Sequence, residues 1–222
     1  MKERGMIFNG EMVRAILDGR KTQTRRIMKE QPVLNGNFYE VFGSAWSKGM
    51  TSIPAVPGHS LSTRCPFGAV GDRIWVRETF CPVDDTQYGG EKWVDYRATP
   101  KFEESHPAGW DSAPNDAEAL KWRPSIHMPR WASRILLEIT NVRVERLNAI
   151  SEEDARAEGI IDGGCLNCGE PEPCGCANPE PDATDAFAYL WQSIYGQESW
   201  NANPWVWVIE FERASSWEFY IR

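Results

Sequence analysis

Hydrophobic periodicity is interrupted by long stretches of this chain, so only short helices and strands are expected between them. Residues 27–70 are rich in Pro, Gly and Ser, and residues 82–124 again lack a sustained period. Apolar residues still make up 41% of the 222 residues, which is enough for a real core and excludes a fibrous or disordered class. The pattern predicts one α+β domain, a partly closed β-barrel with short helices at its rim. We expect insertions in it at about 28–70, 82–124 and 162–182.

Local signals place the individual elements within this scheme. Asn9 is a suitable N-cap for a helix over 11–18 that Gly19 ends, and Ser151 is a suitable N-cap for a helix over 152–158 that Gly159 ends. A third helix is expected over 184–195, where apolar side chains share one face. The strands that we expect lie at residues 6–8, 74–76, 92–98, 134–144 and 205–211.

Charge and hydropathy limit the classes of partner. The net charge is −8, which argues against a protein that coats polyanions generally, yet residues 20–29 carry five basic side chains and no acidic one. A local anion site therefore remains possible. The chain has no apolar run of about 18 residues and no apolar segment after its first residues, so we expect a cytoplasmic protein without a membrane span. Most of the eleven Trp are expected in the core, with stacking on bases as the alternative.

The segment GRKTQTRR, residues 19–26, combines hydroxyl and basic groups directly after a helix end. A hydroxyl beside a lysine is a workable nucleophile only where the lysine is desolvated enough to lose its proton. In an extended segment Thr22, Thr24 and Arg26 would share one face, with Lys21 at the turn before them. A solvated basic face or a contact with an anion is the alternative reading of the same residues.

Four segments resemble, in chain order, the landmarks of the ASCH domain, a small β-barrel of the PUA-like superfamily. They are residues 19–26, residues 71–76 (GDRIWV), residues 147–159 and residues 206–211 (VWVIEF). The likeness covers about half of the chain, and the three proposed insertions have no counterpart in the minimal domain. The whole chain also resembles uncharacterised or "morphogenetic" proteins that phages and prophages encode.

The resemblance implies a set of functional residues. Minimal bacterial ASCH enzymes are amidohydrolases that remove acetyl from 4-acetylcytidine, and their lysine, threonine and glutamate match Lys21, Thr24 and Glu158. Thr24 would accept the acyl group, Lys21 would take its proton, and Glu158 would hold the lysine and pass a proton to the leaving amine. Substrate contacts are assigned to Arg25, Arg26, Trp75 and Glu78. A structural ion pair with an arginine is the alternative for Glu78, and other ASCH proteins are assigned RNA binding or ribonuclease activity.

A cysteine-rich loop forms a separate candidate site. Four of the six cysteines follow the spacing C-x2-C-x5-C-x-C, and four thiolates suit a tetrahedral structural zinc without an open position. Reduced free thiols and, less favourably, disulfides are the alternatives. The proposed zinc ligands are Cys165, Cys168, Cys174 and Cys176; Cys65 and Cys81 stand alone and are expected to be buried or idle.

The leading functional hypothesis is an ASCH-type hydrolase acting on an N-acylated nucleoside or nucleotide, which needs no cofactor for catalysis. The alternative is a non-catalytic module that binds RNA or modified bases, and a further one is a phage accessory protein that binds a host protein through its insertions. The basic residues that would carry nucleic-acid binding are Lys21, Arg25, Arg26, Arg123, Arg130 and Arg134.

Overall fold

A computed structural model describes residues 1–42, 50–56, 60–84, 86, 90–101, 121–161 and 183–214. The chain divides into two compact units, which are described separately below. Unit 1 comprises Met1–Asp18, Arg73–Glu138 and Arg213–Arg222, and unit 2 comprises Gly19–Asp72 and Ile139–Glu212. The described residues form short strands and short helices, which confirms the predicted α+β class.

Unit 1 is built on the strands β1 (Glu3–Ile7), β6 (Arg73–Arg77) and the first residues of β9 (Leu136–Arg146). Strands β1 and β6 run parallel, and β6 pairs antiparallel with β9. Ile74 and Val76 are buried while the residues around them are half-buried, which is the alternation expected of a strand with one face on a core.

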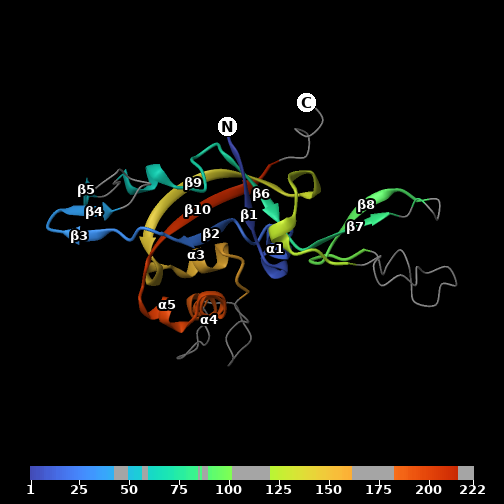
Figure 1. Cartoon of the computed structure of the whole chain (residues 1–222). Coiled ribbons are helices and arrows are strands. Elements are labelled where there is room, and N and C mark those ends of the chain that lie inside the picture. The colour runs from blue at the N-terminus through green and yellow to red at the C-terminus, as the bar shows by residue number, and fades with distance from the viewer. Residues whose placement is uncertain are drawn as a thin grey trace, which may run out of the picture. The chain divides into compact units, whose positions relative to one another are not determined.

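Helix α1 (Gly10–Leu17) follows β1 in unit 1 (Figure 1). As predicted, Asn9 is its N-cap: Asn9 Oδ1 accepts a hydrogen bond of 2.8 Å from the backbone N–H of Met12. Val13 and Ile16 are buried at helical spacing, and Gly19 takes a φ of 78° directly after the helix. The local sequence thus determines both the start and the end of α1.

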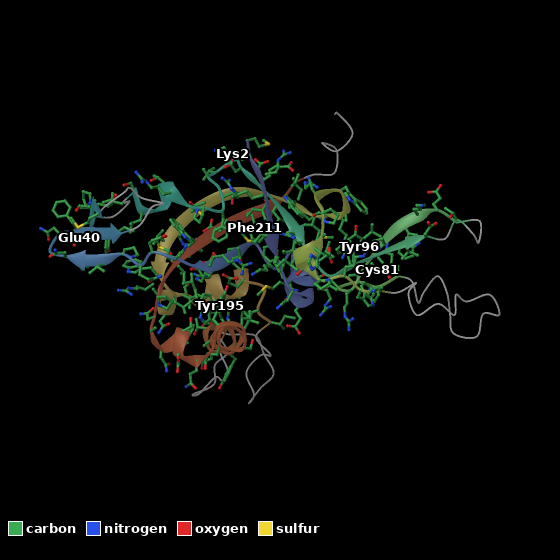
Figure 2. All side chains as sticks on the ribbon, viewed as in Figure 1. Lys2, Glu40, Cys81, Tyr96, Tyr195 and Phe211 are labelled. Atoms are coloured by element: carbon green, nitrogen blue, oxygen red, sulfur yellow. The ribbon has the colours of Figure 1, made fainter. Side chains whose placement is uncertain are left out.

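A hairpin of β7 (Phe80–Asp84) and β8 (Lys92–Tyr96) completes the sheet structure described for unit 1. Cys81 and Tyr96, labelled in Figure 2, lie on its two strands. Phe80 packs on Met128 and Ala132, next to the short 3-10 turns Ser125–His127 and Arg130–Ala132. The strand predicted over 92–98 is therefore present as β8.

Unit 2 holds the rest of β9 together with β2 (Gln23–Ile27) and β10 (Trp205–Arg213), of which only Arg213 falls in unit 1. The strand order is β9-β10-β2, and β10 pairs antiparallel with β2, with Val206 opposite Ile27 and Ile209 opposite Thr24. Val206, Val208 and Ile209 have no exposed surface, so the run predicted over 205–211 is a strand whose apolar side chains are buried.

Three helices accompany these strands: α3 (Glu152–Ala157), α4 (Ala183–Tyr195) and α5 (Gln197–Asn201). Figure 1 shows α3 beside β2 and α4 next to α3, and Tyr195, labelled in Figure 2, ends α4. Phe187 and Trp191 of α4 pack with Val206 and Val208 of β10 in one core cluster. Both helices that the sequence predicts in this unit are thus present, and none of the helices described is long and apolar enough to cross a membrane.

The described residues of the insertion predicted at about 28–70, which lacks a sustained hydrophobic period, include a three-stranded antiparallel sheet. Its strands are β3 (Val33–Asn35), β4 (Phe38–Phe42) and β5 (Met50–Pro54), and a 3-10 helix follows at Ser60–Arg64. Gly36 lies in the two-residue turn between β3 and β4 with a φ of 56°, a conformation that favours glycine. The strands are so short that hydrophobic periodicity could not reveal them.

Candidate functional site

Lys21 and Glu158 form a buried ion pair in unit 2. Lys21 Nζ lies 2.6 Å from Glu158 Oε2 and also donates a hydrogen bond of 2.8 Å to the backbone carbonyl of Glu158. The two residues are 2% and 4% exposed. Buried charged side chains are rare unless they are paired, so the pairing accounts for their burial.

The backbone holds both members of this pair in place. Lys21 and Glu158 form an isolated antiparallel β-bridge, and the N–H of Thr22 donates to the carbonyl of Ala157 at 2.8 Å. Helix α3 begins at Ser151, whose Oγ accepts from the N–H of Asp154, and it ends at Glu158, before Gly159 with a φ of 88°. A carboxylate at a helix C-terminus meets the negative end of the helix dipole, and the Lys21 ammonium offsets that repulsion.

Burial lowers the pKa of Lys21 below its ordinary value, because desolvation disfavours the charged ammonium. The charge and hydrogen bond of Glu158 act in the opposite direction, and the positive charges of Arg25 and Arg26 add to the lowering. Lys21 is therefore closer to its neutral form at neutral pH than an exposed lysine is. That is the condition under which the amine can accept a proton.

Arg25 contacts the Glu158 carboxylate of this pair and is itself buried. Its Nη1 donates to Glu158 Oε1 at 3.3 Å and its Nη2 to Asp154 Oδ2 at 2.8 Å. The guanidinium also lies 5.8 Å from the centroid of the Phe187 ring, while its Nε has no hydrogen-bond partner among the described residues. Arg25, which was predicted to contact the substrate, is held by two carboxylates in the structure.

A second arginine extends this network. Arg143 donates to both Asp154 carboxylate oxygens at 2.8 Å, and it also pairs with Glu145 and Glu210. Gln23 donates to the backbone carbonyl of Asp154 at 2.6 Å. Burial alone would raise the pKa of Asp154, but the hydrogen bond from Arg143 and the two arginine charges outweigh it and lower that pKa.

Sequence reasoning missed Arg143 and Asp154 as members of this network. Asp154 was visible only as one of the acidic residues in the first turn of α3, where the helix dipole is a sufficient reason for it. Arg143 lies in a strand, and nothing in its local pattern singles it out.

Thr24 is buried in β2, opposite Ile209 of β10. Side chains alternate along a strand, and Gln23 and Arg25 both contact Asp154, so the alternation directs Thr24 to the other face of β2. Among the described residues, the Thr24 hydroxyl makes no hydrogen bond to Lys21 or Glu158. The structure brings Lys21 and Glu158 together and shows no such link to Thr24.

No protein-family model, curated protein or solved structure matches this chain. The likeness to the ASCH domain therefore depends on the four sequence segments alone. Independently of that likeness, the geometry of Lys21, Glu158 and their neighbours indicates what chemistry the site can support.

Two of the residues assigned to substrate belong to unit 1. Glu78 is buried, and Arg134 binds it through a fork with two bonds of 2.9 Å, which is the ion pair expected as its structural alternative. Trp75 packs against Gly5, where a Cβ would lie 2.6 Å from the indole ring, and the Arg77 guanidinium lies 5.4 Å from that ring. Of the other two residues assigned to substrate, Arg25 is described above, and Arg26 is half-buried on the Thr24 face of β2 in unit 2.

The four proposed zinc ligands, Cys165, Cys168, Cys174 and Cys176, lie outside the described residues. Within the described ranges, no group of three or more His, Cys, Asp or Glu side chains is arranged to hold a metal ion. Cys81 is buried, which raises the pKa of its thiol, and Cys65 is half-buried; neither forms a disulfide.

Proposed function

We propose that this protein is an ASCH-type amidohydrolase that acts on an N-acylated nucleoside or nucleotide. The observation that supports the proposal is the buried Lys21–Glu158 pair, in which an amine of lowered pKa lies 2.6 Å from a carboxylate. Enzymes commonly place a proton acceptor and a proton carrier in this way, in a desolvated site with perturbed pKa values. The nucleoside class follows from the resemblance of the four segments to the ASCH domain.

The proposed reaction has two halves. The Thr24 hydroxyl attacks the acyl carbon, and its proton passes to neutral Lys21 Nζ. Glu158 relays a proton from Lys21 to the nitrogen of the leaving amine as the C–N bond breaks. Water then attacks the acyl-threonine ester, which releases the carboxylic acid and restores the hydroxyl. The net reaction is an amide and water giving an acid and an amine.

The two assignments in this reaction have different support. The proton-transfer role of Lys21 and Glu158 is based on their contact and burial. The role of Thr24 as acyl acceptor is based on the family likeness, and the alternation of β2 places its side chain opposite those of Gln23 and Arg25. The experiment below therefore tests the two roles with separate variants.

Arg25 is assigned a positioning role in this proposal. Its hydrogen bond to Glu158 Oε1 leaves the other oxygen, Oε2, for Lys21, so the carboxylate is held from both sides. Asp154 and Arg143 in turn fix Arg25 and α3. Such a second layer of contacts keeps a reacting pair in one geometry.

The non-catalytic alternative has less support from the same contacts. Four of the six basic residues proposed to bind RNA already pair with carboxylates, and binding phosphate would require breaking those pairs. They are Lys21, Arg25, Arg130 and Arg134, with Glu158, Asp154, Glu3 and Glu78 among their partners.

The proposal extends to features that accompany the resemblance. We infer that the sheets belong to a PUA-like, partly closed barrel, that the cysteine-rich loop binds a structural zinc, and that the protein is phage- or prophage-encoded and cytoplasmic. The likeness of the four segments and the cysteine spacing support these points.

The test is release of acetate from a panel of N-acylated nucleosides, with 4-acetylcytidine first. Lys21→Arg keeps a cation but removes the base, since arginine stays protonated, and we expect it to lower kcat between about a hundredfold and ten-thousandfold. Lys21→Met should do the same without the charge. Thr24→Ala should abolish hydrolysis while nucleoside binding persists, and Thr22→Ala is the matched control, because Thr22 is an exposed hydroxyl of the same segment.

Each result bears on one part of the proposal. If wild type hydrolyses none of the panel, the hydrolase proposal fails. If Thr24→Ala retains full activity while both Lys21 variants lose it, Thr24 is not the nucleophile and the proton-transfer role stands. Full activity in Lys21→Arg would refute the role of Lys21 as base.

A further inference from the structure

Unit 1 contains a pocket of about 590 Å³ that the proposed hydrolase does not use. Four stretches line it: the end of β1 and the start of α1 with Glu11 and Arg14, the residues after β6 with Glu78 and Thr79, the pair Arg97 and Ala98 after β8, and Ser125. Its volume lies within the range typical of small-molecule sites. The polar groups in its wall indicate what kind of molecule fits.

The side chain of Arg14 extends back along α1, so its positive charge lies near the first turn of that helix. The residue lies in the last turn of α1, yet its Nη1 donates a hydrogen bond of 3.1 Å to the carbonyl of Ala98 and lies 3.6 Å from the position that a Cβ on Gly10 would take. The N-terminus of a helix is itself positive. Arg14 and the helix N-terminus thus bring positive charge to the pocket wall, and the exposed carboxylate of Glu11 lies on the same lining.

Arg97 adds a second positively charged residue to the lining of the pocket. Its backbone N–H donates to the carbonyl of Thr79 at 3.0 Å, which fixes the residue beside the stretch after β6. The guanidinium lies 5.8 Å from the Trp122 ring centroid, so part of it is supported by stacking while its N–H groups remain donors. Arg14 and Arg97 together suit a phosphate or a carboxylate.

Glu78 gives the pocket an acceptor as well. The carboxylate is buried, and the Arg134 fork uses one lone pair of each oxygen. Each oxygen can accept one further hydrogen bond. A ligand N–H that reaches Glu78 would supply one of these hydrogen bonds to a carboxylate that water reaches poorly.

We propose that this pocket binds a small molecule that carries an anionic group and an N–H donor, with the anion at Arg14 and Arg97 and the donor at Glu78. Two classes of molecule carry both groups. A nucleoside monophosphate has its phosphate and the N–H groups of its base, and a free amino acid has its carboxylate and ammonium. The site does not depend on the proposed hydrolase activity.

The test is calorimetric titration of the full chain with the four nucleoside monophosphates, a panel of free amino acids and inorganic phosphate. We expect one of the first two classes to bind, and binding to weaken about ten- to a hundredfold in Arg97→Gln and in Arg14→Gln, as for loss of a charge-assisted hydrogen bond. Arg123→Gln is the matched control, an exposed arginine of unit 1 that does not line the pocket. Lys21→Met should bind like wild type, which separates this site from the proposed active site.

Three results would overturn the inference. The first is no binding of either class at millimolar concentration. The second is binding that Arg14→Gln and Arg97→Gln both leave unchanged. The third is inorganic phosphate binding as tightly as the best organic ligand, since the donor to Glu78 would then contribute nothing.

Discussion

Glu158→Gln removes the negative charge from a site that contains two buried cations. Arg25 keeps Asp154 as a partner in this variant, whereas Lys21 keeps only the carbonyl of residue 158 and a neutral amide. Removing one member of a buried pair typically costs about 3–5 kcal/mol of unfolding free energy. We expect a loss near the lower end of that range at pH 7, and a smaller loss of about 1–3 kcal/mol in Lys21→Met, because Glu158 would still pair with Arg25.

The protonation of Lys21 sets a ceiling on this loss. A lysine left without its partner can release its proton, and at pH 7 that costs about 4.6 kcal/mol, from 1.36 kcal/mol for each pH unit below the ordinary pKa of about 10.4. At pH 9 the same ceiling is about 1.9 kcal/mol. A destabilisation by Glu158→Gln of about 3 kcal/mol or more at pH 7 should therefore fall to about 1.9 kcal/mol or less at pH 9.

Wild type should itself show a pH dependence from Lys21, which enters the comparison with Glu158→Gln. The pKa of Lys21 is lower in the folded state than in the unfolded state, so between these two values the unfolded chain binds the extra proton. Stability from this group therefore rises as the pH rises through that window.

The assay is urea unfolding followed by tryptophan fluorescence at pH 7, 8 and 9. Glu212→Gln is the matched control, since Glu212 is an exposed carboxylate of β10 in the same unit. The double variant Lys21→Met/Glu158→Gln should cost less than the sum of the single ones, because the pair is removed as a whole. A Glu158→Gln loss below about 1 kcal/mol at pH 7, or one that does not change with pH, would refute the reasoning.

Two further predictions concern the rest of the network and the cysteine loop. The pKa of Asp154 is lowered, so its contribution is present above the unfolded value of about 3.9 and is lost as the pH falls through the lower folded value. Asp154→Asn should cost about 1–3 kcal/mol at pH 7 and lose less further stability on acidification than wild type, measured by urea unfolding at pH 7, 4 and 3; an unchanged acid loss would contradict this. The four clustered cysteines should bind one zinc per chain in metal analysis of purified, untagged protein, with exchange for Cd²⁺ as a check on thiolate ligation; zinc below about a tenth of an equivalent with intact thiols would refute the site.

The elements that local signals specify were predictable from the sequence. Asn9 and Ser151 cap helices where expected, and the apolar run at 205–211 forms a strand, because capping hydrogen bonds and continuous apolar surface are properties of neighbouring residues. The sheet of β3, β4 and β5 escaped prediction, because its strands are three to five residues long and are stabilised by pairing with each other.

The same distinction applies to the candidate site. Lys21 and Glu158 are 137 residues apart, and only the family likeness connected them before the structure showed their contact. Arg143 and Asp154 had no such guide, since an arginine in a strand and an aspartate in a first helical turn each have an ordinary explanation. Long-range charge pairing is a property of the fold, and local pattern does not encode it.

The extended backbone of residues 21–25 determines which of their side chains can act together. Lys21, Gln23 and Arg25 all contact α3 or its C-cap, as residues two apart on one face of an extended segment do. Thr24 lies between two of them and is directed to the opposite face. The Lys21–Glu158 pair is accounted for by geometry whether or not Thr24 takes part, and a threonine nucleophile additionally requires its hydroxyl to reach Lys21. Activity that survives in Thr24→Ala and disappears in Lys21→Arg would therefore indicate water, activated by Lys21, as the nucleophile.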